Sequence, residues 1–323
     1  MTPAALAAQL HDLQPSADDM LGDVLDGLSR QPRRLPSKYF YDARGSRLFE
    51  RICEQPEYYL TRAELALMQA HLPQIADTLG PEALLVEYGS GSGIKTRLLL
   101  QHLHAPVAYM PVEISRSALM TSVEGLADDF PDIQMLPVCA DFTQPITLPA
   151  PERTQRRTVI YFPGSTIGNF ETSAAVRLLR QMREEMGAGG AALVGVDLLK
   201  DPAIIEAAYN DAAGVTAAFT LNMLAHINRT LGADFDVDGF AHRARFNPQT
   251  ERIETHIDSL REQDVHIEDR TFHFDAGDSI LVEYSCKYSR ASFARLAAEA
   301  GLRVAQVWTD PEDLFSLQYL EPA

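Results

Sequence analysis

Three glycines at alternate positions mark the clearest candidate for a ligand site in this sequence. Residues 84–88 read as a buried strand, the run 89–93 is rich in glycine, and residues 94–100 read as the start of a helix. A glycine loop between a strand and a helix lets backbone N–H groups approach a ligand closely. This arrangement is typical of a site for a nucleotide-type cofactor, and a plain strand-to-helix turn is the alternative. The predicted cofactor contacts in the loop are Gly89, Ser90 and Gly91.

The spacing of these glycines separates cofactor classes. Dinucleotide-binding loops have the pattern G-x-G-x-x-G, whose third glycine packs the helix against the strand. Ile94 occupies the place of that third glycine here, which disfavours a nicotinamide cofactor. The ATP-binding pattern G-x-x-x-x-G-K-[ST] is absent from the sequence. The observed pattern, E-x-G-x-G-x-G, instead resembles motif I of S-adenosylmethionine (SAM) methyltransferases.

Polar residues near the next predicted elements fit an adenosyl group. Glu113 ends the second strand, where a carboxylate could accept both hydroxyls of a ribose. Asp141 and Phe142 follow the third strand and could accept the amino group of an adenine and cover its ring. Lys95, at the head of the first helix, could pair with the carboxylate of an amino-acid-like tail. Together these residues favour an adenosyl cofactor without a pyrophosphate, and SAM fits that description.

Each of these residues also has an ordinary structural interpretation. Glu113 could simply neighbour a helix cap, Asp141 could belong to a solvated turn, and Lys95 could be a surface lysine. The spacing alone does not choose between these alternatives and a cofactor site.

The elements that must carry these side chains alternate between apolar strands and helices. Strands are predicted near 84–88, 107–112, 133–138, 158–162 and 191–197, and helices near 62–79, 94–103, from 115 onward and 171–186. Thr61 and Glu64 have the spacing of a capping box for the helix at 62–79. The alternation predicts a parallel sheet covered on both faces, with ligands at the carboxyl ends of its strands.

The pattern changes after Asp197. Residues 203–230 read as helical, and several segments between 240 and 288 alternate polar and apolar residues. Such alternation suits an antiparallel sheet with one solvated face. A helix near 290–300 then precedes a closing strand at 304–308.

Composition limits the classes of function. The chain has 323 residues, of which 46% are hydrophobic and 23% charged, as in ordinary soluble proteins. Its formal net charge of −17 argues against nucleic acid and anionic membranes as partners. Three separated cysteines and no metal-ligand spacing predict free thiols, a cytoplasmic location and no metal site. We recognise no signal peptide or membrane span and expect a monomer.

The loop after the fourth predicted strand is the place where an acceptor would face the cofactor. It reads Gly164-Ser165-Thr166-Ile167-Gly168-Asn169 and lacks the N/D-P-P-Y/F motif used on amide or nucleobase nitrogens. It also contains no obvious general base. An aliphatic amine fits this loop, because its own lone pair attacks and it needs only positioning and proton loss to water.

Five longer motifs resemble the L-histidine Nα-methyltransferase family of ergothioneine biosynthesis. They are L-P-x-K-x-F-Y-D at 35–42, P-E-Y-Y at 56–59, G-S-T-I-G-N at 164–169, the stretch Tyr209–Phe219 and E-x-S-C-K at 283–287. The resemblance implies an α/β fold, with a Rossmann-like SAM-dependent methyltransferase domain and a second, smaller α+β substrate domain. The first would comprise residues 61–200 and 287–323, and the second residues 1–60 and 201–286.

The resemblance also implies an activity and roles for individual residues. Three methyl groups would pass in succession from SAM to the α-amino group of L-histidine, which gives hercynine. Asn169 and Tyr209 would hold the substrate carboxylate, and Glu283 and Ser285 the imidazole ring. Tyr41 and Tyr58 would surround the amine as the catalytic pair, with Tyr58 also binding substrate, and Phe219 would wall the pocket.

The chemistry of these residue types agrees with those roles. Glu283 and Ser285 are two apart on a predicted strand, so both side chains face the same way. A carboxylate can accept from one imidazole N–H, and a hydroxyl can serve the other nitrogen. The alternatives are a solvated strand face for this pair and core packing for the two tyrosines.

Two other functions remain open at this point. One is a SAM-dependent N-methyltransferase of another amino acid, such as a tryptophan derivative. The other is a non-catalytic SAM sensor, against which the intact loop at 164–169 argues.

Overall fold

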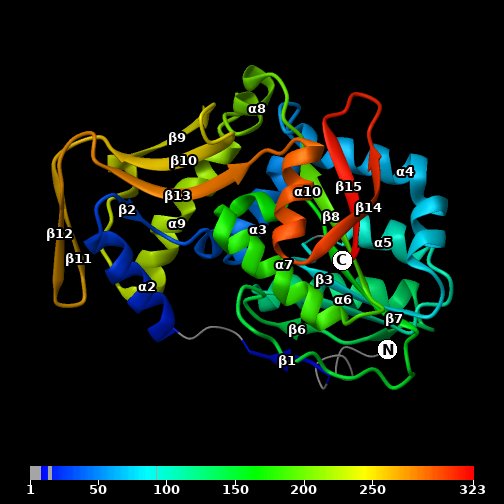
Figure 1. Cartoon of the computed structure of the whole chain (residues 1–323). Coiled ribbons are helices and arrows are strands. Elements are labelled where there is room, and N and C mark those ends of the chain that lie inside the picture. The colour runs from blue at the N-terminus through cyan, green and yellow to red at the C-terminus, as the bar shows by residue number, and fades with distance from the viewer. Residues whose placement is uncertain (1–8, 14–16, 92) are drawn as a thin grey trace. The chain divides into compact units, whose positions relative to one another are not determined.

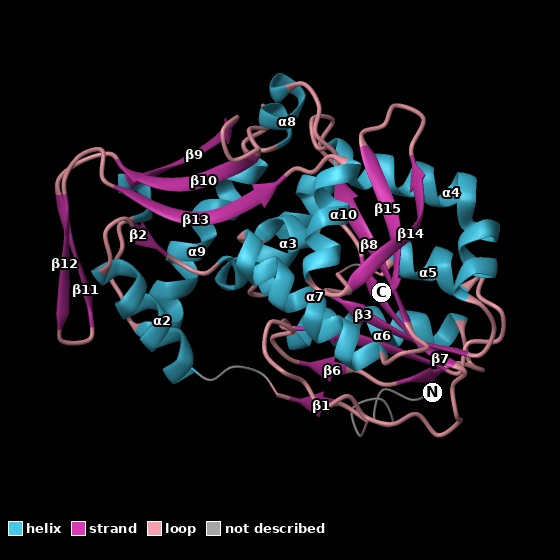
Figure 2. Cartoon of the chain, viewed as in Figure 1, coloured by secondary structure: helices cyan, strands magenta, loops and turns pink. Residues whose placement is uncertain are grey.

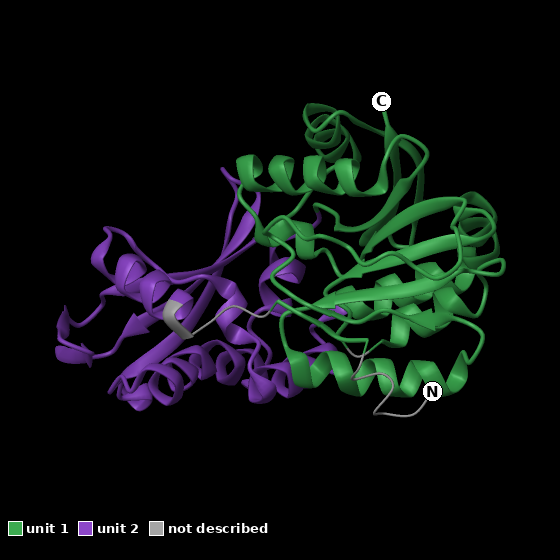
Figure 3. Cartoon of the chain, turned by 90° about the horizontal axis from the view of Figure 1, so that it is seen from below, with its two compact units in different colours: residues 1–14, 60–199, 286–323 green, residues 15–59, 200–285 purple. Residues whose placement is uncertain are grey.

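The structure of the chain is a computed structural model, which describes residues 9–13, 17–91 and 93–323. Contacts between residues divide the chain into two compact units, shown in separate colours in Figure 3. Unit 1 comprises Met1–Gln14, Leu60–Leu199 and Cys286–Ala323, and unit 2 comprises Pro15–Tyr59 and Lys200–Ser285.

Unit 1 is built on one mixed sheet (Figure 1). Its strands run in the spatial order β1-β6-β4-β3-β7-β8-β15-β14, and β5 pairs with β4 outside that path. Their bounds are His11–Asp12 (β1), Ala83–Tyr88 (β3), Ala108–Glu113 (β4), Gln134–Met135 (β5), Val138–Cys139 (β6), Arg157–Phe162 (β7), Ala191–Asp197 (β8), Leu302–Thr309 (β14) and Phe315–Pro322 (β15). The strands from β1 to β8 pair in parallel, and β15 and β14 extend the sheet in antiparallel fashion.

The helices of unit 1 connect these strands. They are Tyr59–Leu79 (α4), Ile94–Leu100 (α5), Arg116–Asp129 (α6), the 3-10 turn Thr166–Asn169 (η2), Thr172–Met186 (α7) and Arg290–Glu299 (α10). Figure 2 shows them in cyan around the magenta strands. Tyr59, the first residue of α4, is counted with unit 2.

Both faces of the central strands are buried, as the unbroken apolar runs predict. Val86 and Tyr88 lie in one apolar cluster with residues of α7 and α10. Glu87, between them, points to the opposite face and accepts a hydrogen bond from Thr96 of α5 (2.6 Å). The predicted Rossmann-like α/β fold with a smaller α+β unit is therefore confirmed.

The order of the strands fixes where a ligand belongs. The chain passes from β3 to β4 and β6 on one side, and then returns to β7 and β8 on the other side of β3. In open α/β sheets, ligands bind outside the carboxyl ends of the strands where the direction of winding reverses. The residues that follow β3 and β7, which include 89–91 and 163–169, lie at that reversal.

The ends of unit 1 differ from the predicted elements. β1 pairs with β6 in this unit, whereas the predicted substrate domain includes residues 1–60. Residues 1–8 of that prediction lie outside the described part of the chain. The prediction that a strand at 304–308 closes the chain is wrong, because β15 follows it and inserts between β8 and β14. Ser316 and Gln318 interrupt the apolar pattern of β15, although both are fully buried.

Unit 2 combines helices with a small sheet. The sheet has the order β2-β13-β10-β9, and β11 and β12 form a separate antiparallel hairpin. The strands are Arg33–Arg34 (β2), Phe240–Asn247 (β9), Arg252–Ser259 (β10), Gln263–Ile267 (β11), Arg270–Phe274 (β12) and Ser279–Cys286 (β13), whose last residue is counted with unit 1. The helices are Ala17–Ser29 (α2), Ser37–Phe40 (η1), Ala43–Cys53 (α3), Pro202–Ala208 (α8), Val215–Leu231 (α9) and Val237–Gly239 (η3).

The predicted helix over 203–230 is two helices. α8 ends at Ala208, and α9 begins at Val215 after the segment 209–214. Asp211 causes the break, because its carboxylate accepts from the backbone N–H groups of Val215 and Thr216, both at 2.7 Å. Tyr209 therefore lies in a short connection rather than inside a helix.

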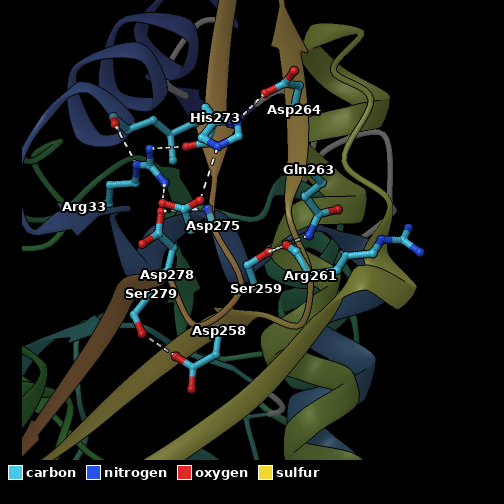
Figure 4. A network of polar contacts seen from close by, with 11 residues as sticks. Arg33, Asp258, Ser259, Arg261, Gln263, Asp264, His273, Asp275, Asp278 and Ser279 are labelled. Atoms are coloured by element: carbon cyan, nitrogen blue, oxygen red, sulfur yellow. Dashed lines mark hydrogen bonds and ion pairs between the residues drawn. The ribbon is translucent and has the colours of Figure 1, made fainter.

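A polar network ties the hairpin to the sheet of unit 2 (Figure 4). Arg33 pairs with Asp278 (3.2 Å) and donates to the carbonyl of His273 (2.5 Å), and its guanidinium covers the Phe274 ring at 4.0 Å. The His273 imidazole bonds to Asp264 (2.8 Å), and this contact raises the pKa of His273. These contacts hold β2 and β12 near the start of β13, the strand that carries Glu283 and Ser285.

Candidate active site

The glycine loop in unit 1 has the backbone geometry of a ligand cradle. Gly89 and Gly91 have φ values of +73° and +50°, a region that side chains with a Cβ rarely adopt. A Cβ on Gly91 would meet no heavy atom within 4 Å, so the space beside it is open. The hydroxyl oxygen of Ser90 is buried and has no hydrogen-bond partner among the described residues. An unpaired buried hydroxyl beside open backbone fits a site that a polar ligand completes.

Glu113, at the end of β4, lies against this loop. Its carboxylate accepts from the backbone N–H of Ser115 (3.0 Å) and from that of Gly91. Burial raises the pKa of Glu113, and these backbone donors oppose that shift. A carboxylate has about four lone-pair sites, so acceptor capacity remains for the hydroxyls of a ribose. The ribose contact itself stays a prediction.

Phe142 lies beside the same loop, and Asp141 precedes it in the chain. Asp141 is buried, and its Oδ1 accepts from the backbone N–H (3.0 Å) and hydroxyl (2.6 Å) of Thr143. The Phe142 ring stacks on the Tyr88 ring, with their centroids 5.2 Å apart. A Cβ on Gly89 would lie 3.9 Å from the Phe142 ring. The fold thus brings Phe142, one of the two predicted adenine contacts, to the first glycine of the loop.

Lys95, in the first turn of α5, forms an ion pair with Glu64 at 2.6 Å. The predicted capping box of Thr61 and Glu64 is wrong, because α4 already begins at Tyr59. The Glu64 carboxylate instead bonds to Lys95 and to the backbone N–H of Gly164. The spacing T-x-x-E fits both uses, so sequence alone could not choose between them.

Sequence reasoning missed Glu87 as a site residue. It is fully buried inside β3 and accepts from the hydroxyls of Thr96 (2.6 Å) and Tyr109 (2.5 Å). Burial raises the pKa of Glu87 to about 7, while these two hydrogen bonds and nearby Lys95 oppose the shift. A carboxyl group within an otherwise apolar strand, directly before the glycine loop, was the available signal.

Asn169 belongs to unit 1, at the end of η2 after β7. The loop that leads to it is held by Ser165, whose hydroxyl accepts from the backbone N–H of Asp197 at 2.9 Å. Gly168 packs against the backbone of residue 286, because a Cβ there would lie 2.7 Å from the carbonyl oxygen of Cys286. The loop is therefore fixed at both ends, and the role of Asn169 toward a substrate remains a prediction.

The predicted aromatic residues come together in unit 2. Tyr41 meets the Phe219 ring edge-on at 5.6 Å, and Phe49 lies within 6.3 Å of Tyr58 and 6.0 Å of Phe219, measured between ring centroids. Tyr58 lies 6.4 Å from Tyr209. Phe49 was not predicted, and it joins these rings through the packing of α3 on α9.

Tyr209 and Ser285 are directly hydrogen-bonded, with 2.6 Å between their hydroxyl oxygens. Glu283 lies two residues before Ser285 on β13, so both side chains face the same way. Burial raises the pKa of Tyr58 well above its usual range, and the nearby Glu283 carboxylate is among the further causes. Tyr58 is therefore a neutral phenol at neutral pH, within electrostatic range of the Glu283 carboxylate.

Asp42 fixes the backbone next to Tyr41. It caps α3 by accepting from the backbone N–H of Gly45 (2.7 Å), and it also accepts from Asn222 (2.8 Å) and pairs with Arg229 of α9. Burial opposes ionisation of Asp42, but these donors and charges outweigh it and lower its pKa. The side chain thus joins the turn at Tyr41 to α9, which carries Phe219.

We expect Asp42→Ala to lower the free energy of unfolding by about 1–2 kcal/mol, because it removes a helix cap. Urea denaturation followed by circular dichroism measures the change. Asp26→Ala is the matched control, because Asp26 forms only an exposed pair with Arg30 at 3.9 Å, and we expect it to cost less than about 0.5 kcal/mol. Equal losses for the two variants would contradict the role of Asp42.

Other features of the described residues bear on function. All three cysteines are free thiols. Among the residues that the structure describes, no group of histidine, cysteine and acidic side chains is arranged to hold a metal ion. None of the described helices has both the length and the apolar character needed to cross a membrane.

The chain is similar to known proteins over nearly its whole length. The sequence pattern of a family described as "Histidine-specific methyltransferase, SAM-dependent" matches residues 20–322. A protein of Mycolicibacterium smegmatis named histidine N-alpha-methyltransferase is 38% identical, and the match covers 94% of each chain. A protein of the same name from Mycobacterium tuberculosis is 39% identical over 91% of this chain and 92% of its own.

A longer relative shows the same similarity over part of its length. Ergothioneine biosynthesis protein 1 of Neurospora crassa is 31% identical over 86% of this chain, which corresponds to 32% of the fungal protein.

Proposed function

Because this chain belongs to the histidine-specific, SAM-dependent methyltransferase family, we propose that it transfers three methyl groups to the α-amino group of L-histidine. The product is hercynine, Nα,Nα,Nα-trimethyl-L-histidine, an intermediate of ergothioneine biosynthesis. The single observation that carries the proposal is the set of Glu283, Ser285 and Tyr209 beside four aromatic rings in unit 2.

Unit 1 is proposed to hold the cofactor. SAM supplies a methyl group on a positively charged sulfur, which an amine can attack. The backbone of residues 89–91 would approach its adenosyl group, Glu113 would bind the ribose, and Asp141 with Phe142 would bind the adenine. The unpaired hydroxyl of Ser90 and the open space at Gly91 support this assignment. Lys95 would pair with the cofactor carboxylate.

Unit 2 is proposed to recognise histidine. The Glu283 carboxylate would accept from one imidazole N–H, and the Ser285 hydroxyl would serve the other ring nitrogen. Tyr209 would bind the substrate carboxylate, as would Asn169 of unit 1. The Tyr209 hydroxyl, proposed to bind the substrate carboxylate, and the Ser285 hydroxyl, proposed to bind the imidazole, are hydrogen-bonded at 2.6 Å. Each of these hydroxyls therefore orients the other.

The aromatic residues suit a reaction that creates a permanent cation. Tyr58 remains protonated at neutral pH, so it can orient an amine by hydrogen bonding but does not act as its base. The faces of Tyr41, Tyr58 and Phe219 can stabilise a methylated ammonium by cation–π interaction. Positioning for in-line attack then provides the main acceleration, and each released proton passes to water.

Mass analysis of the products tests this proposal. The protein is incubated with SAM and with each of the 20 common amino acids separately, and we expect a product heavier by three methylene groups from histidine alone. Turnover of another amino acid in preference to histidine would overturn the substrate assignment. Binding of SAM without any turnover would support a sensor instead.

A further inference from the structure

Glu64 contacts residues of the proposed cofactor site, although the sequence did not predict it as a site residue. Its side chain is completely buried on α4, and its Oε2 lies 2.6 Å from Lys95 Nζ. The backbone N–H of Gly164 donates to the same carboxylate, at 3.2 Å from Oε1 and 3.1 Å from Oε2. The Glu64 carboxylate therefore holds both Lys95, the proposed cofactor contact, and Gly164, which lies in the loop after β7.

The surrounding backbone leaves room for this carboxylate. A Cβ on Gly195 of β8 would lie 3.1 Å from Glu64 Oε1 and 3.0 Å from the nitrogen of Gly164. Contacts this close would force the carboxylate or the loop to shift. The absence of a side chain at Gly195 thus permits the close approach of α4, β8 and residue 164.

The two partners differ in access to a ligand. The Lys95 side chain is 22% exposed, whereas that of Glu64 is 0% exposed. The Lys95 side chain is thus partly open to a ligand, whereas the Glu64 carboxylate is closed to one. An effect of Glu64 on the cofactor must therefore pass through Lys95 or the Gly164 backbone.

We propose that Glu64 is a positioning residue, which orients Lys95 toward the carboxylate of the SAM amino-acid tail. The inference rests on the proposed function, because it takes Lys95 as the contact for that tail. A lysine side chain has several rotatable bonds, and a fixed partner reduces the freedom that it loses when it binds a ligand. The effect of Glu64 should thus be confined to ligands that carry the tail.

Two ligands separate this effect from general damage to the site. S-adenosylhomocysteine carries the amino-acid tail, and 5′-methylthioadenosine shares its adenosyl group but lacks the tail. By calorimetry on the full chain, we expect Glu64→Gln to weaken S-adenosylhomocysteine about tenfold or more and methylthioadenosine by less than about twofold. The double variant Glu64→Gln/Lys95→Met should bind S-adenosylhomocysteine as Lys95→Met alone does, because the two residues act as one unit.

The experiment has a matched control on the same helix as Glu64. Asp77→Asn removes a carboxylate from the exposed side of α4 and should leave both affinities unchanged. If Glu64→Gln does not fold, Glu64→Asp keeps the charge, withdraws it from Lys95 by one methylene and takes the same test. Equal weakening of both ligands, or unchanged binding of both, overturns the inference. Failure of the wild-type protein to bind S-adenosylhomocysteine would instead overturn the proposed function.

Discussion

Replacing Glu283 by glutamine is expected to lower kcat/KM for histidine by about 10- to 150-fold, because loss of a charge-assisted hydrogen bond costs roughly 1.5–3 kcal/mol. Glutamine keeps the shape of the side chain, but its neutral oxygen is a weaker acceptor for an imidazole N–H. Initial rates at low histidine and saturating SAM measure the change.

Measuring cofactor affinity together with histidine turnover shows which of the two ligands Glu283 contacts. If Glu283 binds the imidazole, affinity for S-adenosylhomocysteine stays unchanged and the loss falls on histidine. Glu262→Gln is the matched control, because Glu262 is an exposed acid of the same unit. Unchanged kcat/KM for histidine in Glu283→Gln would assign the carboxylate to the solvated face of β13 and not to substrate recognition.

The strand, loop and helix around the proposed cofactor site could be predicted from the sequence better than the contacts that surround them. A loop such as 89–93 is a local pattern, and its strand and helix adjoin it in the chain. Glu113 and Asp141 could be predicted too, because parallel strands end at the same edge of a sheet. In the structure Gly91 contacts Glu113, and Phe142 lies beside Gly89.

Long-range contacts explain what was missed. Glu64 lies 31 positions from Lys95 and 100 positions from Gly164, so no local spacing relates them. Tyr209 was predicted within a helix because the alanine-rich sequence around it favours one, and the capping of α9 by Asp211 overrides that propensity. Phe49 joins the aromatic rings only through the packing of α3 on α9.

Lys287 has a structural role, although it shares a sequence motif with two proposed substrate-binding residues. It stands in the motif E-x-S-C-K together with Glu283 and Ser285, but the resemblance gave it no function. Its ammonium lies 2.7 Å from Asp197 Oδ2, and both side chains are completely buried in unit 1. Removing one partner of such a pair leaves an uncompensated buried charge. This residue therefore holds the end of β8, whereas Glu283 and Ser285 belong to unit 2.

Glu87 leads to a prediction about the pH dependence of stability. Burial raises the pKa of Glu87 from 4.5 to about 7 in the folded protein. Below the lower value both states are protonated, and Glu87 has no effect on stability. Between pH 4.5 and 7 the unfolded chain ionises first, so the free energy of unfolding falls as the pH rises. Above pH 7 the destabilisation is complete, at about 3 kcal/mol.

Glu87→Gln should remove that decline, because an amide does not ionise and its oxygen can still accept from Thr96 and Tyr109. We expect wild-type stability to fall by about 3 kcal/mol more than that of the variant between pH 4.5 and pH 8. Urea unfolding at several pH values measures the difference, in which other acids with raised pKa values, such as Glu113 and Glu185, cancel because they titrate in both proteins. Glu124→Gln, at an exposed position of α6, should follow the wild type. Parallel curves for wild type and Glu87→Gln would contradict the prediction, because they would show that folding does not shift the pKa of Glu87.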